Sequence, residues 1–274
     1  QLIKKKTYMN RSIKMKERKK AIINILLLFL TLVINALGAL GLINGYSQKE
    51  VSDRYLTLIT PSPTTFSIWS IIYILLILSC IIMVIRSDND YYKNVINRIT
   101  SLFRFSSLFN ILWIISFSYL QLELSVIFIV AFLFSLSLIL EKLLSIKSKG
   151  HFIIPLSFGL YAGWLFIATV VNISATLVKL NWNGFGISDT LWAFTILIVA
   201  VVIVFLVNVK NKNAVFPLPI AWAYFGINNF LKSSQGFSGS YPILEKASIV
   251  GMILLIMISI FRFYKNNYKI IPTT

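Results

Sequence analysis

Residues 152–178 read FIIPLSFGLYAGWLFIATVVNISATLV, a run of 27 positions without Asp, Glu, Lys or Arg. A membrane-crossing helix needs about 20 mostly apolar residues, because the hydrocarbon core of a bilayer is roughly 30 Å thick. The apolar residues are continuous rather than alternating, which argues against a strand of a β-barrel. This stretch therefore predicts a transmembrane helix.

Seven further stretches of the same kind lie on either side of it. They are residues 21–43, 64–85, 105–121, 124–140, 190–209, 213–231 and 247–261. Of the 274 residues, 57% are hydrophobic and 13% are charged, and this charged fraction is about half of what a soluble protein carries. We therefore predict an all-α, polytopic membrane helix bundle with about eight transmembrane helices.

The formal charge of +17 comes mainly from short basic segments between the apolar runs. If all eight segments cross and the N-terminus is cytoplasmic, 21 Lys and Arg residues lie inside and 5 lie outside. This asymmetry is the positive-inside pattern. It predicts a multi-pass protein of the cell membrane, with cytoplasmic tails at 1–20 and 265–274. It also favours contact of the basic tail with anionic lipid over nucleic-acid binding.

The first apolar run has an alternative interpretation. A basic start followed by small residues near Ala36–Ala39 is also typical of a cleavable signal peptide. The run is longer than a usual signal core, which favours a transmembrane helix.

The residue types available for catalysis are few. Cys80 is the one cysteine and His151 the one histidine, so the sequence offers no intrachain disulfide and no thiolate metal site. No segment carries a charge near its middle, and no zinc-protease, Walker or nucleophile-elbow motif occurs. We therefore expect no catalytic residue, no metal ligand and no enzymatic activity. His151 is expected to be a solvated interfacial residue rather than an axial ligand of haem.

Aromatic and amide side chains are what the apolar segments do contain. By their spacing, three groups each share one helical face: Trp69 with Tyr73, Asn110 with Trp113, and Trp164 with Ala168 and Asn172. A small residue between an indole and an amide leaves a slot in which a flat apolar molecule could lie. From the residues alone, a pocket of this kind and tight helix packing are equally well supported.

In these stretches the chain resembles the TspO/MBR family, the translocator protein and tryptophan-rich sensory protein group. The similar stretches are PSPTTFSIWSIIY at 61–73, NILW at 110–113 and YAGWLFIATVVN at 161–172. The spacing Trp-x-x-x-Ala-x-x-x-Asn in the last stretch is the most specific feature. The resemblance covers about 21–182, the five-helix bundle of the family, and residues 183–264 would add three helices, as in longer tryptophan-rich sensory proteins.

The resemblance implies a pocket inside the five-helix bundle, closed by the loop between its first two helices. Family members bind porphyrins, haem and other planar or sterol-like molecules there, and they commonly form homodimers. We therefore expect a hydrophobic small-molecule ligand such as a porphyrin or haem, with no cofactor required. The residues expected to bind it are Trp69, Tyr73, Asn110, Trp113, Trp164, Ala168 and Asn172.

The chain departs from the family pattern at two places. Shorter members usually carry a tryptophan where this chain has Thr64 and Thr65. That tryptophan is tied to light-dependent porphyrin breakdown, so its absence argues against this activity. The proline that usually precedes the Tyr-x-x-Trp pattern is Leu160 here, with Pro155 further upstream.

Three functions remain open from the sequence. The first is a membrane receptor or sensor that binds a planar hydrophobic ligand without converting it. The second is a transporter of a hydrophobic or amphipathic solute, for which Pro217, Pro219 and Gly226 would permit a kinked helix. The third is a porphyrin-degrading enzyme.

Overall fold

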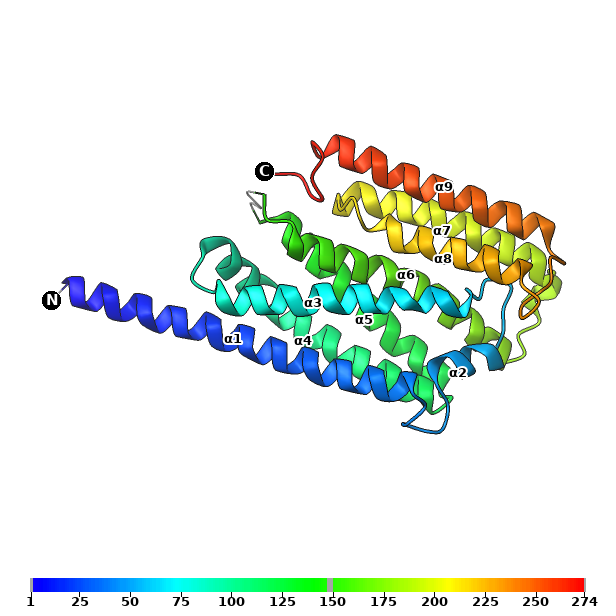
Figure 1. Cartoon of the computed structure of the whole chain (residues 1–274), viewed down its shortest axis with the longest axis horizontal. Coiled ribbons are helices and arrows are strands. Elements are labelled where there is room, and N and C mark those ends of the chain that lie inside the picture. Colours follow the sequence, from blue (N-terminus) through cyan, green and yellow to red (C-terminus); the bar gives the residue numbers. More distant parts are fainter. Residues whose placement is uncertain (1, 147–149, 274) are drawn as a thin grey trace.

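The computed structural model describes residues 2–146 and 150–273, with side chains from Met15 onward. Throughout this part the chain is helical and connected by turns (Figure 1). The long helices are α1 (Leu2–Ala39), α3 (Ile68–Ile85), α4 (Asp90–Ser118), α5 (Leu122–Leu144), α6 (Ile153–Lys179), α7 (Asp189–Asn211), α8 (Pro217–Lys232) and α9 (Pro242–Lys265). The short helices are α2 (Gln48–Arg54), η1 (Pro63–Ser67) and η2 (Gly184–Gly186).

Each of the eight predicted apolar segments lies largely within one of the long helices. Within the described residues, seven helices are long and apolar enough to cross a membrane, namely all the long helices except α8. Helix α8 has 16 residues, which corresponds to about 24 Å, and it runs alongside α9 and α6 (Figure 1). The protein is therefore a polytopic membrane helix bundle, as predicted.

The predicted helix bounds were wrong at α4. The apolar run starts at residue 105, but the helix starts at Asp90, so that only a short turn separates it from the end of α3 at Ile85. Asn89 caps the helix by accepting a hydrogen bond from the amide of Tyr91 at 3.0 Å. Arg104 lies on the helix because its Nε donates to Oδ1 of Asn24 on α1, at 3.3 Å. The charged side chain of Arg104 thus lies against α1, and α4 continues through this position.

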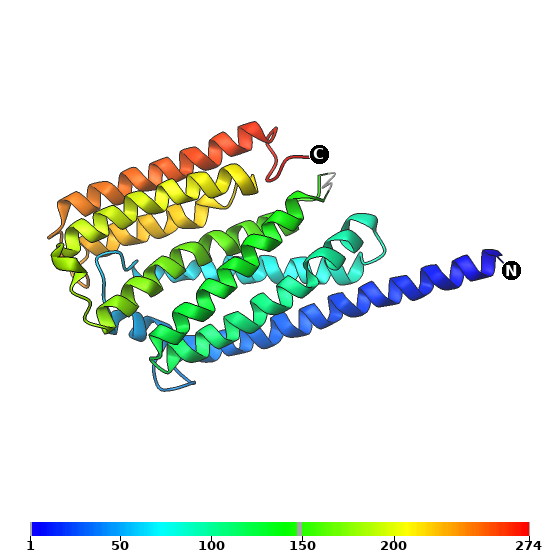
Figure 2. The ribbon, with the colours of Figure 1, turned by 180° about the vertical axis from the view of Figure 1, so that it is seen from behind.

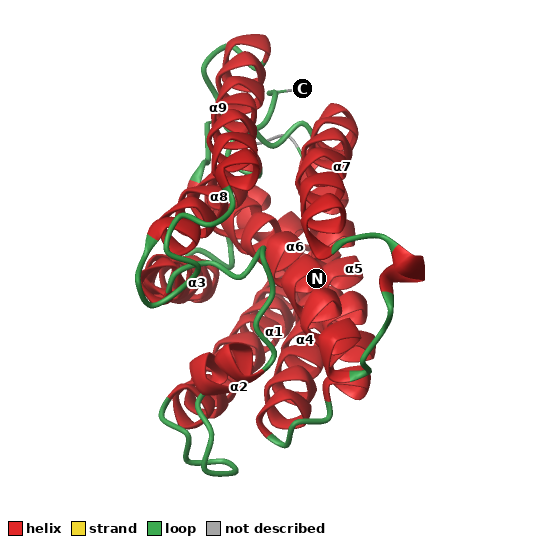
Figure 3. Ribbon diagram, turned by 90° about the vertical axis from the view of Figure 1, so that its right-hand side faces the viewer, coloured by secondary structure: helices red, strands yellow, loops and turns green. Residues whose placement is uncertain are grey.

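The helices form two groups that lie side by side. Helices α1, α3, α4, α5 and α6 make one bundle, and α7, α8 and α9 make a second group against α6 (Figures 1 and 3). Both termini lie at one end of the molecule and α2 lies at the other. The first turns of α1, from Leu2, project beyond the bundle (Figure 2), whereas Lys20 at the end of the predicted tail donates to Oδ1 of Asn97 on α4 at 2.5 Å.

Small residues allow the two groups to pack closely. A Cβ atom added to Gly163 of α6 would overlap the carbonyl oxygen of Phe216, which directly precedes α8. About two turns earlier on α6, the carbonyl oxygen of Pro155 accepts a hydrogen bond from Nδ2 of Asn213 at 2.8 Å. Close backbone approach at small residues is a common way for helices to associate in a membrane. The C-terminal group is thus packed onto the five-helix bundle through the start of α8.

A chain of hydrogen bonds crosses the five-helix bundle. The hydroxyl of Tyr73 donates to Oδ1 of Asn35 at 2.8 Å, and Nδ2 of Asn35 donates to Oδ1 of Asn110 at 2.6 Å. Nδ2 of Asn110 then donates to the hydroxyl of Tyr161 at 2.9 Å. The chain joins α3, α1, α4 and α6, and it gives each of these buried polar groups a partner, as an apolar surrounding requires.

Replacing Gly163 with alanine should separate α6 from α8. The added methyl group has no room beside Phe216, so we expect a loss of about 1–3 kcal/mol in the free energy of unfolding, measured by denaturant titration in detergent micelles. The control is Val199→Ile on the outward face of α7, where the side chain is 46% exposed. Equal stability of the two variants would contradict the packing described here.

The pair Asn35 and Asn110 should be energetically coupled. A double-mutant cycle with Asn35→Ala and Asn110→Ala should give a coupling free energy of about 0.6 kcal/mol, and at most about 1.7, the range found for hydrogen bonds between membrane helices. Asn110→Ala combined with Asn228→Ala is the control and should be additive, because Asn228 bonds to α9 instead. Additivity in both cycles would argue against the hydrogen-bond chain.

Candidate functional site

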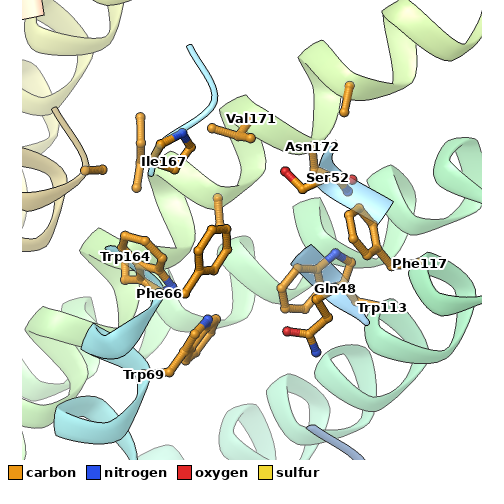
Figure 4. A pocket seen from close by; sticks show the side chains of 14 residues that line it. Gln48, Ser52, Phe66, Trp69, Trp113, Phe117, Trp164, Ile167, Val171 and Asn172 are labelled. Atoms are coloured by element: carbon orange, nitrogen blue, oxygen red, sulfur yellow. The ribbon is translucent and has the colours of Figure 1, made fainter. Parts of the chain in front are cut away.

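A cavity lies near the end of the molecule that carries α2, between α3, α4, α6 and α8 (Figure 4). Its volume is about 60 Å³. The wall is mostly aromatic and aliphatic, with neutral polar groups from Gln48, Ser52 and Asn172 and no charged side chain. The cavity is therefore an uncharged, mainly apolar site.

Five of the seven residues expected from the sequence lie on this wall. They are Trp69, Trp113, Trp164, Ala168 and Asn172. Tyr73 and Asn110 are not on the wall and instead belong to the hydrogen-bond chain described above. The ring of Tyr73 stacks on Trp69, with 5.0 Å between the ring centroids. These two residues thus support the wall from behind.

Trp69 is at the centre of the aromatic cluster. Its ring centroid lies 6.4 Å from that of Trp113 and 6.1 Å from that of Trp164, and the latter pair is edge-to-face. Phe66 makes a second edge-to-face contact with Trp164 at 6.1 Å. Such pairs contribute about 0.5–1.5 kcal/mol beyond the burial of their surface. The aromatic wall is therefore held in place by its own members.

Several wall residues were not expected from the sequence. They are Gln48 and Ser52 of α2, Pro61 and Phe66 before α3, Phe117 of α4, Ile167, Val171 and Ala175 of α6, and Ala223 of α8. A signal for α2 was present, because Ser47-Gln-Lys-Glu50 has the spacing of a capping box. Ala223 carried no signal, since a single alanine in an apolar helix is unremarkable.

Helix α2 closes one side of the cavity, as the family resemblance implied for this loop. The hydroxyl of Ser47 accepts from the amide of Glu50 at 3.2 Å, and the carboxylate of Glu50 accepts from the amide of Ser47 at 2.7 Å. These bonds lower the pKa of the Glu50 carboxyl, so the cap is ionised at neutral pH. The fully buried Val51 attaches α2 to Phe117 and Ala175.

Three N–H groups of wall residues have no hydrogen-bond acceptor among the described residues. They are Nε1 of Trp113, Nε1 of Trp164 and Nε2 of Gln48. Trp164 is 2% exposed and Trp113 is 7% exposed, so the two indole groups are not hydrated from outside. Leaving a buried donor unpaired costs about 1–3 kcal/mol. These three N–H groups have almost no accessible surface of their own, so an acceptor could reach them only if the wall moves.

The amide of Asn172 is used differently. Its Nδ2 donates to the hydroxyl of Ser125 on α5 at 3.0 Å, and that hydroxyl lies 3.2 Å from its Oδ1. Asn172 therefore fixes α6 against α5 while its side chain forms part of the wall.

His151 lies before the opposite end of α6, away from this cavity. Its ring stacks on Tyr91 at a centroid distance of 4.2 Å and meets Tyr92 edge-on. The neighbouring Lys147 and Lys149, which placed it at a basic interface in the sequence, lie outside the described residues. Among residues 2–146 and 150–273, no three His, Cys, Asp or Glu side chains gather as a metal site would require.

Comparison with known proteins gives one family. The family described as TSPO-like protein matches residues 21–261. The match extends beyond the stretch 21–182 on which the resemblance was seen and includes α7, α8 and most of α9. No curated protein and no solved structure matches the chain significantly. Because the match covers most of the sequence, the chain belongs to the TSPO-like protein family.

Proposed function

We propose that this protein is a membrane receptor or sensor that binds a planar, largely apolar ligand in the cavity below α2, without converting it. The ligand class that fits best is a tetrapyrrole or a similarly flat molecule that carries carbonyl or carboxylate oxygens. The proposal also holds that the protein lies in the cell membrane with both termini in the cytoplasm. This orientation would place the cavity in the outer half of the bilayer. The formation of homodimers stays a prediction.

The observation that carries this proposal is the set of unpaired N–H groups around an apolar cavity. The indoles of Trp113 and Trp164 offer flat apolar faces and donors at the same time. A purely hydrocarbon ligand would leave these donors unpaired, whereas a ligand with acceptor oxygens would satisfy them. The wall therefore favours a flat ring system with acceptors at its edge.

The cavity is too small for such a ligand in the arrangement described here. Its 60 Å³ is well below the roughly 300 Å³ at the lower end of ligand pockets. Binding would require part of the wall to move outward. The segments with the fewest packing partners are α2 and the Pro61–Ser67 segment, because the other walls belong to long, closely packed helices.

The transport alternative receives less support from the same residues. Pro217 and Pro219 lie in the first turn of α8, where proline is tolerated without a kink. They therefore mark the start of a helix rather than a break in one. Solute flux into proteoliposomes that exceeds the flux into empty vesicles would favour transport over the receptor function.

The enzymatic alternative has its own test. Illumination of the protein with bound protoporphyrin should leave the pigment spectrum unchanged if the protein only binds it. The appearance of a degradation product at a rate above that of free pigment would favour the enzyme.

Protoporphyrin IX should quench the tryptophan fluorescence of the purified protein. We expect Trp164→Ala to weaken binding because it removes a ring face and a donor, and Ala168→Phe to weaken it because the new ring fills the slot. Each change should raise the Kd about tenfold, the effect of roughly 1.4 kcal/mol, measured by fluorescence titration.

Trp182→Phe is the control for this experiment. It also removes one tryptophan, but Trp182 does not line the cavity and instead contacts Trp192, with the two rings tilted and their centroids 5.1 Å apart. Its Kd should stay within about twofold of the wild type, a change of less than 0.5 kcal/mol. Unchanged titrations for both cavity variants would refute the proposed binding site.

A further inference from the structure

Helix α8 belongs to the C-terminal group, yet it forms part of the cavity. Ala223, near the middle of α8, lines the cavity and is completely buried. The opposite wall comes from Trp164 and Ala168 on α6. The cavity is therefore not formed by the five-helix bundle alone, and the identity of residue 223 affects how much space it has.

The same helix holds the Pro61–Ser67 segment, which forms another side of the cavity through Pro61 and Phe66. The indole Nε1 of Trp222 donates to the carbonyl oxygen of Thr65 at 2.9 Å. The amide of Ser62 donates to the carbonyl oxygen of Gly226 at 3.0 Å. Two hydrogen bonds one helical turn apart thus attach this segment to α8.

The approach of the two segments is unusually close. A Cβ atom added to Gly226 would overlap the side chain of Thr65. The other hydrogen bonds of Ser62 and Thr65 in the described part of the chain are local: they stay within the segment, such as the 2.9 Å contact between their hydroxyls, or join it to Ile68, the next residue along the chain. The attachment of the segment to another helix by hydrogen bonds therefore depends on α8.

We propose that α8 controls the ligand site: Ala223 sets the size of the ligand that fits, and Trp222 with Gly226 keeps the Pro61–Ser67 segment closed. The inference rests on the proposed function, because it assigns a role to α8 at the same cavity. A ligand as large as a tetrapyrrole has to displace part of the wall, because the cavity has a volume of only about 60 Å³. Displacement of the Pro61–Ser67 segment breaks the two bonds to α8, and each donor left without a partner makes this displacement costly.

The closure can be tested without any ligand. The variant Ala175→Cys in a Cys80→Ala background places a single thiol on the cavity wall, at a position that is 4% exposed. Its reaction rate with methyl methanethiosulfonate, a small neutral thiol reagent, reports how often the cavity opens. Adding Trp222→Phe should raise this rate about three- to tenfold, the factor that corresponds to the loss of one ordinary hydrogen bond.

Trp192→Phe is the matched control for Trp222→Phe. Trp192 also donates its Nε1 to a loop carbonyl oxygen, that of Gly184, at 2.8 Å, but it does not line the cavity or touch the Pro61–Ser67 segment. Its labelling rate should equal that of the parent. An unchanged rate for Trp222→Phe, or an equal increase in both variants, would overturn the role of α8 in closure.

The size limit is tested by binding of protoporphyrin IX. Ala223→Leu should raise the Kd about tenfold, since overpacking a filled site has an effect of this order. The matched control is Ala193→Leu on α7, where the alanine is also buried but lies away from the cavity. Equal effects of both variants would show a general loss of packing and would overturn the assignment of Ala223.

The two experiments separate this inference from the proposed function. If the wild-type protein does not bind protoporphyrin but Trp222→Phe still accelerates labelling, the proposed tetrapyrrole function fails and the closure by α8 stands. If protoporphyrin binds and neither α8 variant has an effect, the proposed function stands and the role of α8 is refuted.

Discussion

The structure depends on one constraint: a polar group in the hydrocarbon core has to find its partner within the protein. The chain from Tyr73 through Asn35 and Asn110 to Tyr161 meets this constraint and, in doing so, fixes the relative positions of four helices. Buried polar groups that lack a partner are therefore exceptions that need an explanation. The indole groups of Trp113 and Trp164 lie directly beside a fully satisfied network, yet they have no acceptor among the described residues. These two indole donors share one cavity wall with the likewise unpaired Nε2 of Gln48, and the proposed function assigns this wall to a ligand.

The apolar segments predicted the helical architecture well, because bilayer thickness leaves few alternatives for runs of this length. The helix ends were harder to predict. The third segment was expected to begin after Arg104, but the helix begins at Asp90, where Asn89 caps it. Arg104, inside the helix, donates to Asn24 on a neighbouring helix. A partner on another helix, such as Asn24, cannot be predicted from the sequence of the segment alone. Helix α2 was missed for another reason: its seven residues carry no long apolar run, and only the Ser47–Glu50 capping pattern marks it.

Spacing along one helix predicted part of the cavity wall. Trp164, Ala168 and Asn172 share a face of α6, and the structure places that face on the cavity. The same argument could not separate Trp69, which lines the cavity, from Tyr73, which is one turn further and bonds to Asn35. Spacing defines a face of a helix but not the neighbour that it meets. Ala223 shows the limit most clearly, because its place on the wall depends on contacts between residues far apart in the sequence, such as Trp222 and Thr65.

The length of α8 has a consequence for the surrounding lipid. Its 16 residues extend about 24 Å, and the hydrocarbon layer is roughly 30 Å thick. A shortfall of about 6 Å is accommodated by local thinning of the bilayer or by deeper placement of the flanking loops. Either response brings lipid headgroups and water nearer to the outward-facing Trp222 and Phe225 than to the outer faces of α5 or α7. Among the long helices that border the cavity, α8 is therefore the one whose length falls furthest short of the hydrocarbon layer.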